Sequence, residues 1–208
     1  MAVIKESNAS LRAELARAGE ESTALRERLD LMQKTLEDQE QKSRQCNIEI
    51  QNLPEKQSEN LMHLVITMGK VINVPIAKES IRAVHRVEQN VKNDRPKNVV
   101  VELCSRRIRD DIITAVRTRR GLTAGQILES ANADGAHGTR INEQLSSRPI
   151  YVNEHLTLKN KILYAKTRKE ASTKKYKWAW VKNAAILVRK DDRTKAIRVR
   201  SEADLAKL

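Results

Sequence analysis

Apolar side chains recur with heptad spacing along the first forty residues, and most positions between them are charged. The pattern lasts about five heptads, which is long enough to predict a coiled coil over residues 1–44. The apolar stripe is narrow, as expected for a seam covered by a partner helix; the alternative is a single amphipathic helix lying on the protein's own body. The expected seam residues are Leu11, Leu15, Leu25, Leu29, Met32 and Leu36.

The number of chains in this coiled coil is open. Leucine at both seam positions does not choose between a homodimer and a homotrimer. Gly19 and Ser22 weaken the middle of the pattern. The heptads begin almost at Met1 without a capping signal, so we expect the helix to extend further upstream in a parent protein.

Residues 45–153 follow a β-α-β-β-α-β pattern. Ser58 and Ser105 are plausible helix N-caps, each ahead of apolar side chains at helical spacing. This order is that of the ferredoxin-like fold, which RNA-recognition-motif domains share. The expected elements are a strand at 46–50, a helix after Ser58, strands at 81–87 and 98–103, a helix after Ser105 and a strand at 149–153.

The stretch 121–148 holds four of the chain's six glycines. We therefore expect a flexible glycine-containing insertion there, ahead of the last strand of this domain. The expected fold class is α+β: the coiled coil, a ferredoxin-like (RNA-recognition-motif-like) domain at 45–153, and a small basic α/β domain at 154–208.

The last segment begins with a helix. Thr157 can cap a helix that carries Leu158, Ile162 and Ala165 on one face, which we expect to point at a small core. Strands are then predicted at 177–181, 185–189 and 196–200, with a turn at 191–194 and a short final helix after Ser201.

Charge is concentrated in this last segment. The chain carries 40 basic and 27 acidic residues, a formal net charge of +13, and residues 148–208 alone hold 17 basic and 6 acidic ones. Such a field attracts a polyanion such as nucleic acid or an anionic membrane surface. No apolar stretch approaches the roughly 20 residues of a membrane span, and we expect no signal peptide, because the first residues do not combine a basic start with an apolar run. With only two cysteines, we expect an intracellular protein of the cytoplasm or nucleus.

The sequence offers little for catalysis. No phosphate-binding glycine loop is present, and none of the four histidines pairs with a Cys, Asp or Glu at ligand or triad spacing. Asp191 and Asp192 could hold a metal ion, but adjacent acids before Arg193 are more typical of a turn. Cys46 and Cys104 are expected to be buried as small apolar residues. We therefore expect no catalytic residue, metal, cofactor or enzyme activity.

Nucleic-acid binding has better support, because cations neutralise phosphates and exposed aromatic rings stack on bases. Four arginines of the helix after Ser105 fall within about 80° of one another by the 3.6-residue period. They are Arg106, Arg109, Arg117 and Arg120, and a solvated helix face explains them equally well. The C-terminal candidates are Lys159, Lys161, Lys166, Arg168 and Lys169, then Lys174, Lys175, Lys177, Trp178 and Trp180, and finally Arg189, Lys190, Arg193, Lys195, Arg198 and Arg200.

The aromatic residues bear on how a strand would be bound. Trp178 and Trp180 share one face of their strand, so both lie in the core or both on a surface. Because the chain has no Phe, we favour burial of at least one of them. RNA-recognition motifs normally stack bases on aromatics of the two central strands, but 46–50 and 98–103 hold none. Binding is therefore expected to rely on backbone phosphates and to be largely independent of sequence.

Several motifs resemble a known family. They are RPIYVNEHLT at 148–157, KYKWAWVK at 175–182, ILVRKDD at 186–192, IRVRSEADL at 197–205 and, earlier, CNIEIQNLPE at 46–55. They are similar to the baculovirus few-polyhedra protein family, most of all to its cellular and transposon-derived copies in insect genomes. The earlier motif is similar too to the first-open-reading-frame proteins of LINE-type retrotransposons.

The resemblance implies an oligomerising coiled coil, a noncanonical RNA-recognition-motif-like domain and a basic C-terminal domain, and it favours a homotrimer. LINE proteins of this plan coat RNA and chaperone nucleic-acid strands. We therefore expect an oligomer that binds single-stranded nucleic acid, RNA more than DNA, with little sequence preference. The alternative is a structural or interaction protein whose basic domain meets an acidic protein or viral component.

Overall fold

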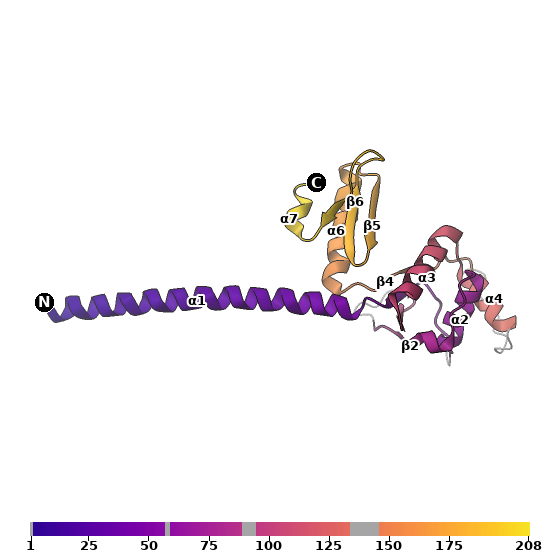
Figure 1. Ribbon diagram of the computed structural model, residues 1–208, viewed down its shortest axis with the longest axis horizontal. Coiled ribbons are helices and arrows are strands. Elements are labelled where there is room, and N and C mark those ends of the chain that lie inside the picture. The colour runs from indigo at the N-terminus through magenta and orange to yellow at the C-terminus, as the bar shows by residue number, and fades with distance from the viewer. Residues whose placement is uncertain (1, 57–58, 89–94, 134–145) are drawn as a thin grey trace. The chain divides into compact units, whose positions relative to one another are not determined.

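The computed structural model describes residues 2–56, 59–88, 95–133 and 146–208, and the chain divides into two compact units, Met1–Lys42 and Ser43–Leu208. The described residues of the first unit lie within one continuous helix, α1 (Ala2–Ser43), shown in Figure 1. All six predicted seam residues on it are more than half exposed, from 53% at Leu25 to 75% at Leu15. The predicted helix is therefore confirmed, whereas its association with the same helix of other copies in a coiled coil stays a prediction.

A four-stranded antiparallel sheet organises the first part of the second unit. Its strand order is β2-β3-β1-β4. Its strands are β1 (Asn47–Gln51), β2 (Ile81–Arg86), β3 (Val99–Leu103) and β4 (Tyr151–Glu154). A short 3-10 turn, η1 (Lys78–Ser80), precedes β2, and the helices of this part are α2 (Leu61–Val71), α3 (Arg106–Arg119) and α4 (Ala124–Ala133).

The ends of two helices test the predicted caps. The Ser105 Oγ accepts a hydrogen bond from the Ile108 N–H at 3.3 Å, as expected of an N-cap. For α2 the cap is Asn60, whose Oδ1 accepts from the His63 N–H at 3.0 Å. The predicted cap Ser58 lies outside the described residues.

One face of this sheet meets the three helices. Ile48 lies opposite Val101 and Ile50 opposite Val99, so these four side chains share a face, and all are at most 1% exposed. Side chains of α2, α3 and α4 complete the same apolar core. The next residue along β1, Glu49, points to the opposite face.

The prediction of a loose segment through 121–148 is wrong for α4. Thr123 and Gln126 form a reciprocal capping box, each donating its backbone N–H to the other's side-chain oxygen. Ile127 and Leu128 are buried in the core beyond it. Gly125 is where the backbone of α4 approaches Ser146, since an added Cβ would lie 3.0 Å from the Ser146 Cβ. The rest of the predicted insertion, 134–145, lies outside the described residues.

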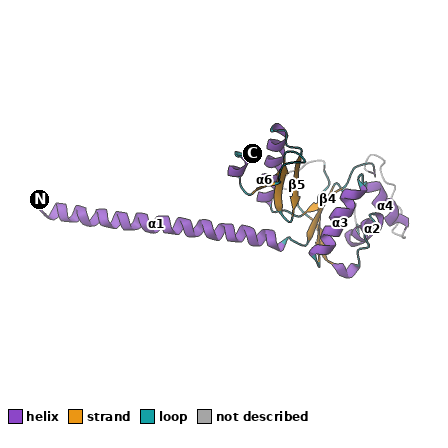
Figure 2. Cartoon of the chain, turned by 45° about the horizontal axis from the view of Figure 1, so that its top comes forward, coloured by secondary structure: helices purple, strands orange, loops and turns teal. Residues whose placement is uncertain are grey.

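The C-terminal part has its own sheet and core. Helix α6 (Leu158–Thr173) lies against a three-stranded antiparallel sheet of order β5-β6-β7, seen in Figure 2. The strands are β5 (Trp178–Lys182), β6 (Ala185–Arg189) and β7 (Ile197–Val199), and a last helix, α7 (Glu202–Leu205), follows. No helix in the described ranges is long and apolar enough to cross a membrane.

The predicted core face of α6 is wrong. Leu158 is 70% exposed and Ile162 47%, whereas the face that packs on the sheet carries Leu163, Thr167 and Ala171. The Thr167 hydroxyl donates to the Leu163 carbonyl at 2.7 Å, which satisfies its polar atom inside the core. A hydroxyl satisfied in this way lets threonine act as a core residue.

Candidate nucleic-acid interface

The three-stranded sheet has one apolar and one aromatic, cationic face. Val181 lies opposite Ile186 on the face buried against α6. The neighbouring pairs alternate to the other face, where Trp178 lies opposite Arg189 and Trp180 opposite Leu187. Strand β7 adds Arg198, opposite Leu187. We call these five residues, Trp178, Trp180, Leu187, Arg189 and Arg198, the tryptophan face.

Cations lie over the Trp178 ring. The Lys177 Nζ is 4.3 Å from the ring centroid, and the Arg189 Cζ is 5.6 Å from it. Such contacts are worth about 0.5–1 kcal/mol at exposed sites. They hold two positive charges beside a flat, partly exposed aromatic surface, the pairing of groups that single-strand-binding proteins offer to phosphates and bases.

The expectation that at least one tryptophan lies in the core is wrong. Both are partly exposed, and neither belongs to the buried cluster. Tyr164 and Tyr176 are the aromatics that pack against that cluster, and the Tyr164 hydroxyl donates to the Ala179 carbonyl at 3.2 Å. Because tyrosines from α6 and the following turn fill this small core, strand alternation sends both indoles outward.

The turn predicted at 191–194 is confirmed. The Asp191 carboxylate accepts from the backbone N–H groups of Arg193 and Thr194, each at 2.8 Å. The Arg193 N–H bond is the main cause that holds the pKa of Asp191 below its usual value. Asp192 pairs instead with Lys177 at 2.7 Å. Within the described part of the chain, no group of three His, Cys, Asp or Glu side chains could hold a metal ion.

The predicted C-terminal cations divide into engaged and free ones. Lys166 pairs with Glu202 at 2.7 Å and Lys174 with Glu170 at 3.1 Å, while Arg168 lies 5.9 Å from the Tyr164 ring. Arg189 also holds the β6–β7 connection, donating to the Thr194 carbonyl at 2.8 Å. The remaining exposed candidates are Lys175, Lys190, Arg193, Lys195, Arg198 and Arg200 on and around the hairpin and Lys169 on α6. Lys159 is exposed as well, but it is engaged with another group.

Lys161 is not a free surface cation. Its Nζ lies 2.7 Å from Oε1 of Glu49, whose side chain is 3% exposed at the centre of the four-stranded sheet. The Asn98 amide donates to the same oxygen at 2.7 Å. Desolvation lowers the pKa of neighbouring His155 to about 4, opposed by Glu49 and reinforced by Lys161. The sheet face opposite the helices therefore carries an ion pair between a buried carboxylate and a partly exposed lysine.

The prediction that Arg109 contacts nucleic acid is wrong. Arg109 is 2% exposed, and its guanidinium donates to the Gln45 carbonyl and to Asn183 Oδ1, the latter at 2.7 Å. Although the helical period places the four arginines on one arc, Arg109 is buried while the other three are exposed. Arg106 is exposed and donates to the Gln45 side chain. Arg117 is exposed on α3, and Arg120 follows its end with φ +50.

Glu154 and Asn183 are neighbours of Arg109 that the sequence reasoning missed. The Glu154 carboxylate accepts from the backbone N–H groups of Asn183 and Ala184, at 2.8 and 2.7 Å. These two residues form the β5–β6 turn with φ +51 and +60, as a type I′ hairpin turn requires. We call Arg109, Glu154 and Asn183 the turn clamp. Asn183 at a two-residue turn is a signal for the hairpin, but nothing local predicts its distant carboxylate.

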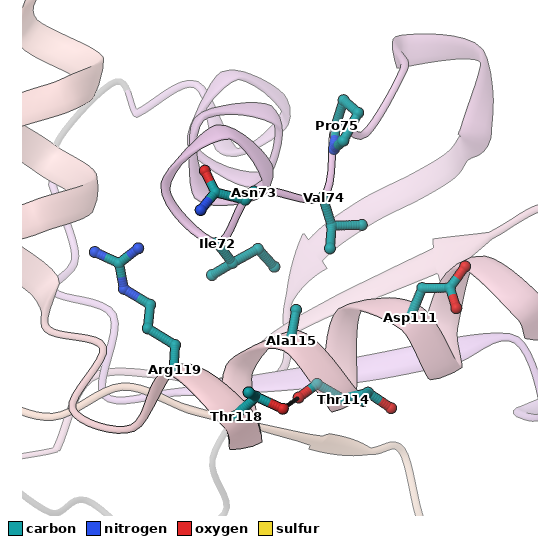
Figure 3. Close-up of a pocket in the computed structure, with 9 residues that line it drawn as sticks. All are labelled: Ile72, Asn73, Val74, Pro75, Asp111, Thr114, Ala115, Thr118 and Arg119. Carbon is teal, nitrogen blue, oxygen red and sulfur yellow. Dashed lines mark hydrogen bonds between the residues drawn. The ribbon is translucent and has the colours of Figure 1, made fainter.

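A separate groove of about 680 Å³ lies between α3 and the loop after α2, shown in Figure 3. Ile72, Val74 and Ala115 face one another across it, with Arg119 near one end and Asp111 near the other. Arg119 donates to the Val71 carbonyl, which ties the two elements together. One carboxylate opposes one cation, so the groove does not attract a phosphate, and none of the predicted contact residues lines it.

The match to a known family falls on the C-terminal part. Residues 157–208 match the family model of baculovirus FP protein domain 2. The matched FP segment begins at Thr157, the N-cap of α6, and contains the whole three-stranded sheet and the tryptophan face. This supports the resemblance to the few-polyhedra family. A search of curated proteins gives no match to the chain.

Proposed function

We propose that this chain is an intracellular, non-enzymatic oligomer that binds single-stranded nucleic acid, RNA more than DNA, with little sequence preference. The tryptophan face carries the proposal. It presents two partly exposed indoles with cations 4.3 and 5.6 Å from one ring, on the segment that holds most of the net charge. Indole rings stack on any base, and the cations contact phosphates whatever the sequence.

The first sheet supports the same mode of binding. A β2-β3-β1-β4 order with helices on one face is that of a ferredoxin-like, RNA-recognition-motif-like domain, which we propose for 45–153. Its other face offers Glu49 in place of a stacking ring. Glu49 is buried and engages Lys161, the cation beside it, so we propose that the strand is held elsewhere, chiefly by the basic domain at 154–208.

The oligomer rests on α1. Its exposed leucine seam supports a parallel coiled coil of two or three chains over 1–44, and several copies would place several tryptophan faces on one strand. Together with the FP segment, this plan supports an origin from a viral or retrotransposon protein that coats nucleic acid.

Fluorescence-anisotropy titration of short single- and double-stranded RNA and DNA at several salt concentrations tests the proposal. The sharpest variant replaces Lys175, Lys190, Arg193 and Arg198 by Gln, because these cations are exposed and hold no ion pair among the described residues. The slope of log affinity against log salt should flatten by up to about 3. The matched control replaces Arg12, Arg17, Arg26 and Arg28 of α1 and should keep the wild-type slope.

Aromatic stacking is tested separately. Trp178→Ala with Trp180→Ala should lower the affinity for a single strand with little change in the salt slope, since a lost stack is worth about 1–3 kcal/mol per base. Equal slopes for the two four-cation variants, with unchanged affinity in the tryptophan variant, would reject the interface.

One observation favours the alternative of an interaction protein. The exposed Leu158 and Ile162 stand on α6 among the exposed cations Lys159 and Lys166. An acidic amphipathic partner would complement that face. Wild-type protein that binds no nucleic acid at any salt concentration would favour this second function.

A further inference from the structure

Helix α6 has apolar side chains on two opposite sides. One side, with Leu163, Thr167 and Ala171, packs on the three-stranded sheet. By the 3.6-residue period, three further apolar residues fall within about 60° of one another on the opposite side. We call them the α6 stripe, which consists of Leu158, Ile162 and Ala165.

The α6 stripe is exposed. Leu158 is 70% exposed, more than any other large apolar side chain in the described part of Ser43–Leu208, and Ile162 is 47% exposed. Ala165, one turn after Ile162, is exposed as well. Single exposed apolar residues are common on protein surfaces, but a line of them along one side of a helix is typical of a contact surface.

Exposed cations flank the stripe. They are Lys159 and Lys166 on one side, Arg168 on the other and Lys169 at the C-terminal end. Glu170 is the one acidic residue of α6, and it pairs with Lys174 at 3.1 Å. Lys166 pairs with Glu202 through side chains that are 50% and 69% exposed, so this ion pair contributes little and can be exchanged for another carboxylate.

The shape and charge of this surface define its partner. An apolar line at i, i+4 and i+7 is the width that one partner helix covers, with its own apolar ridge packed along it. The flanking cations favour a partner with Asp and Glu on both sides of that ridge, because complementary charge across an interface selects the partner.

We propose that the α6 stripe docks an acidic amphipathic helix of another protein, whose apolar ridge packs on Leu158 and Ile162. The proposal rests on the interaction function and does not require nucleic-acid binding. The tryptophan face lies on the other side of the three-stranded sheet, since Val181 and Ile186 face α6 whereas Trp178 faces away. The helix and a single strand therefore bind on opposite sides of the basic domain, at the same time.

The test uses the full chain and two labelled amphipathic peptides, each about three heptads long with leucine at both seam positions. One peptide carries Glu at the flanking positions and the other carries Lys. In fluorescence-anisotropy titrations the Glu peptide should bind at least about tenfold more tightly than the Lys peptide. Absence of binding by the Glu peptide, or equal binding of the two, would overturn the proposal.

Matched variants locate the bound peptide. Leu158→Ser with Ile162→Ser should weaken binding of the Glu peptide at least about tenfold, whereas Val87→Ser should not. Val87 is the control because it is an apolar residue, 37% exposed, that follows β2 at the far edge of the first sheet. If the double serine variant does not fold, Lys166→Glu with Lys169→Glu decides the matter, since it should make the Lys peptide the tighter ligand.

Other occupants of the stripe give distinct results, each of which overturns the proposal. Loss of the Glu peptide in Leu25→Asp would place the peptide on α1. Weaker RNA binding by Leu158→Ser with Ile162→Ser, with the Glu peptide still bound, would assign the stripe to nucleic acid. Binding to phosphatidylserine vesicles that this variant alone loses, without a preference between the peptides, would assign it to a membrane. A change in its oligomeric state would assign it to a second copy.

A combined titration separates this proposal from the proposed function. Saturating single-stranded RNA should leave the Glu peptide bound, and displacement of the peptide would overturn binding on opposite sides. Wild-type protein that binds the Glu peptide but no RNA would reject nucleic-acid binding and leave the docking site standing.

Discussion

At the scale of single residues, two cations that the sequence suggested as ligand contacts are instead engaged by largely buried carboxylates. Arg109 and Lys161 are cations on helices that carry many others, yet each faces a carboxylate from a distant strand. The Arg109 Nη1 lies 4.0 Å from Glu154, and both side chains are under a tenth exposed. A buried charge stripped of its partner is costly, so these residues matter to stability rather than to ligand contact.

The turn clamp gives the first prediction. Glu154→Ala removes the acceptor of two backbone N–H groups and the carboxylate near Arg109, so the free energy of unfolding should fall by about 3 kcal/mol. Urea denaturation measures it. Glu102→Ala breaks a 3.6 Å pair with Arg82 whose side chains are 61% and 43% exposed, and it should cost under about 0.5 kcal/mol. Similar losses of unfolding free energy for Glu154→Ala and Glu102→Ala would contradict a stabilising role of the turn clamp.

A second residue-scale prediction concerns acid. Burial lowers the pKa of His155 from 6.5 to about 4, so between these pH values the unfolded chain binds a proton that the folded chain excludes. Stability should therefore fall as the pH drops from 6.5 towards 4. His155→Gln should reduce this slope by up to one proton, about 1.4 kcal/mol per pH unit. Denaturation at several pH values compares it with His85→Gln, at an exposed ring; parallel curves for all three proteins would contradict the prediction.

At the scale of elements, glycines show where helices are constrained by neighbours. An added Cβ at Gly69 in α2 would lie 2.7 Å from both the Val74 carbonyl oxygen and the Ile76 Cγ1, whereas nothing lies within 4 Å of one at Gly19 in α1. Overpacking costs about 1–3 kcal/mol, which exceeds the gain of about 1 kcal/mol in helix propensity.

The two glycines therefore predict opposite signs. Gly69→Ala should lower the free energy of unfolding of the second unit by about 1–2 kcal/mol, net of the propensity gain. Gly19→Ala should stabilise α1 by about 1 kcal/mol. Circular-dichroism melts measure both, and stabilisation by Gly69→Ala would show that the loop after α2 gives way.

The element scale also shows what the sequence could predict. Most strands were recoverable from alternation, and Ser105 from its capping pattern, because these signals are local. Helix α4 had a local signal too, the capping box of Thr123 and Gln126, which the surrounding glycines obscured. The buried face of α6 and the outward orientation of the tryptophans could not be predicted locally, because they depend on which side chains fill a shared core. The hydrogen bond between Glu154 and Asn183 could not be predicted either, because it joins residues 29 positions apart.

At the scale of the whole molecule, α1 is the element that we propose to bring several copies of the chain together. Leu25→Asp places a charge in the proposed seam, and it should shift the full chain from an oligomer to a monomer in multi-angle light scattering. Leu31→Asp is the matched control, because Leu31 is exposed too, at 66% against 53% for Leu25, but lies off the heptad line. A wild-type monomer, or equal effects of the two substitutions on the oligomeric state, would contradict the predicted coiled coil.

The contacts from Glu49 to Lys161 and from Arg109 to Asn183 join chain segments that are 112 and 74 residues apart, each linking one core to the other. If either core opened alone, a charge in the remaining one would lose its counterpart, which costs several kcal/mol. We therefore expect Ser43–Leu208, one compact unit, to unfold cooperatively despite its two cores. In evolutionary terms, we expect the basic half to lose stability when it is exchanged between proteins without Glu49, Arg109 and Glu154, which contact it from the other half.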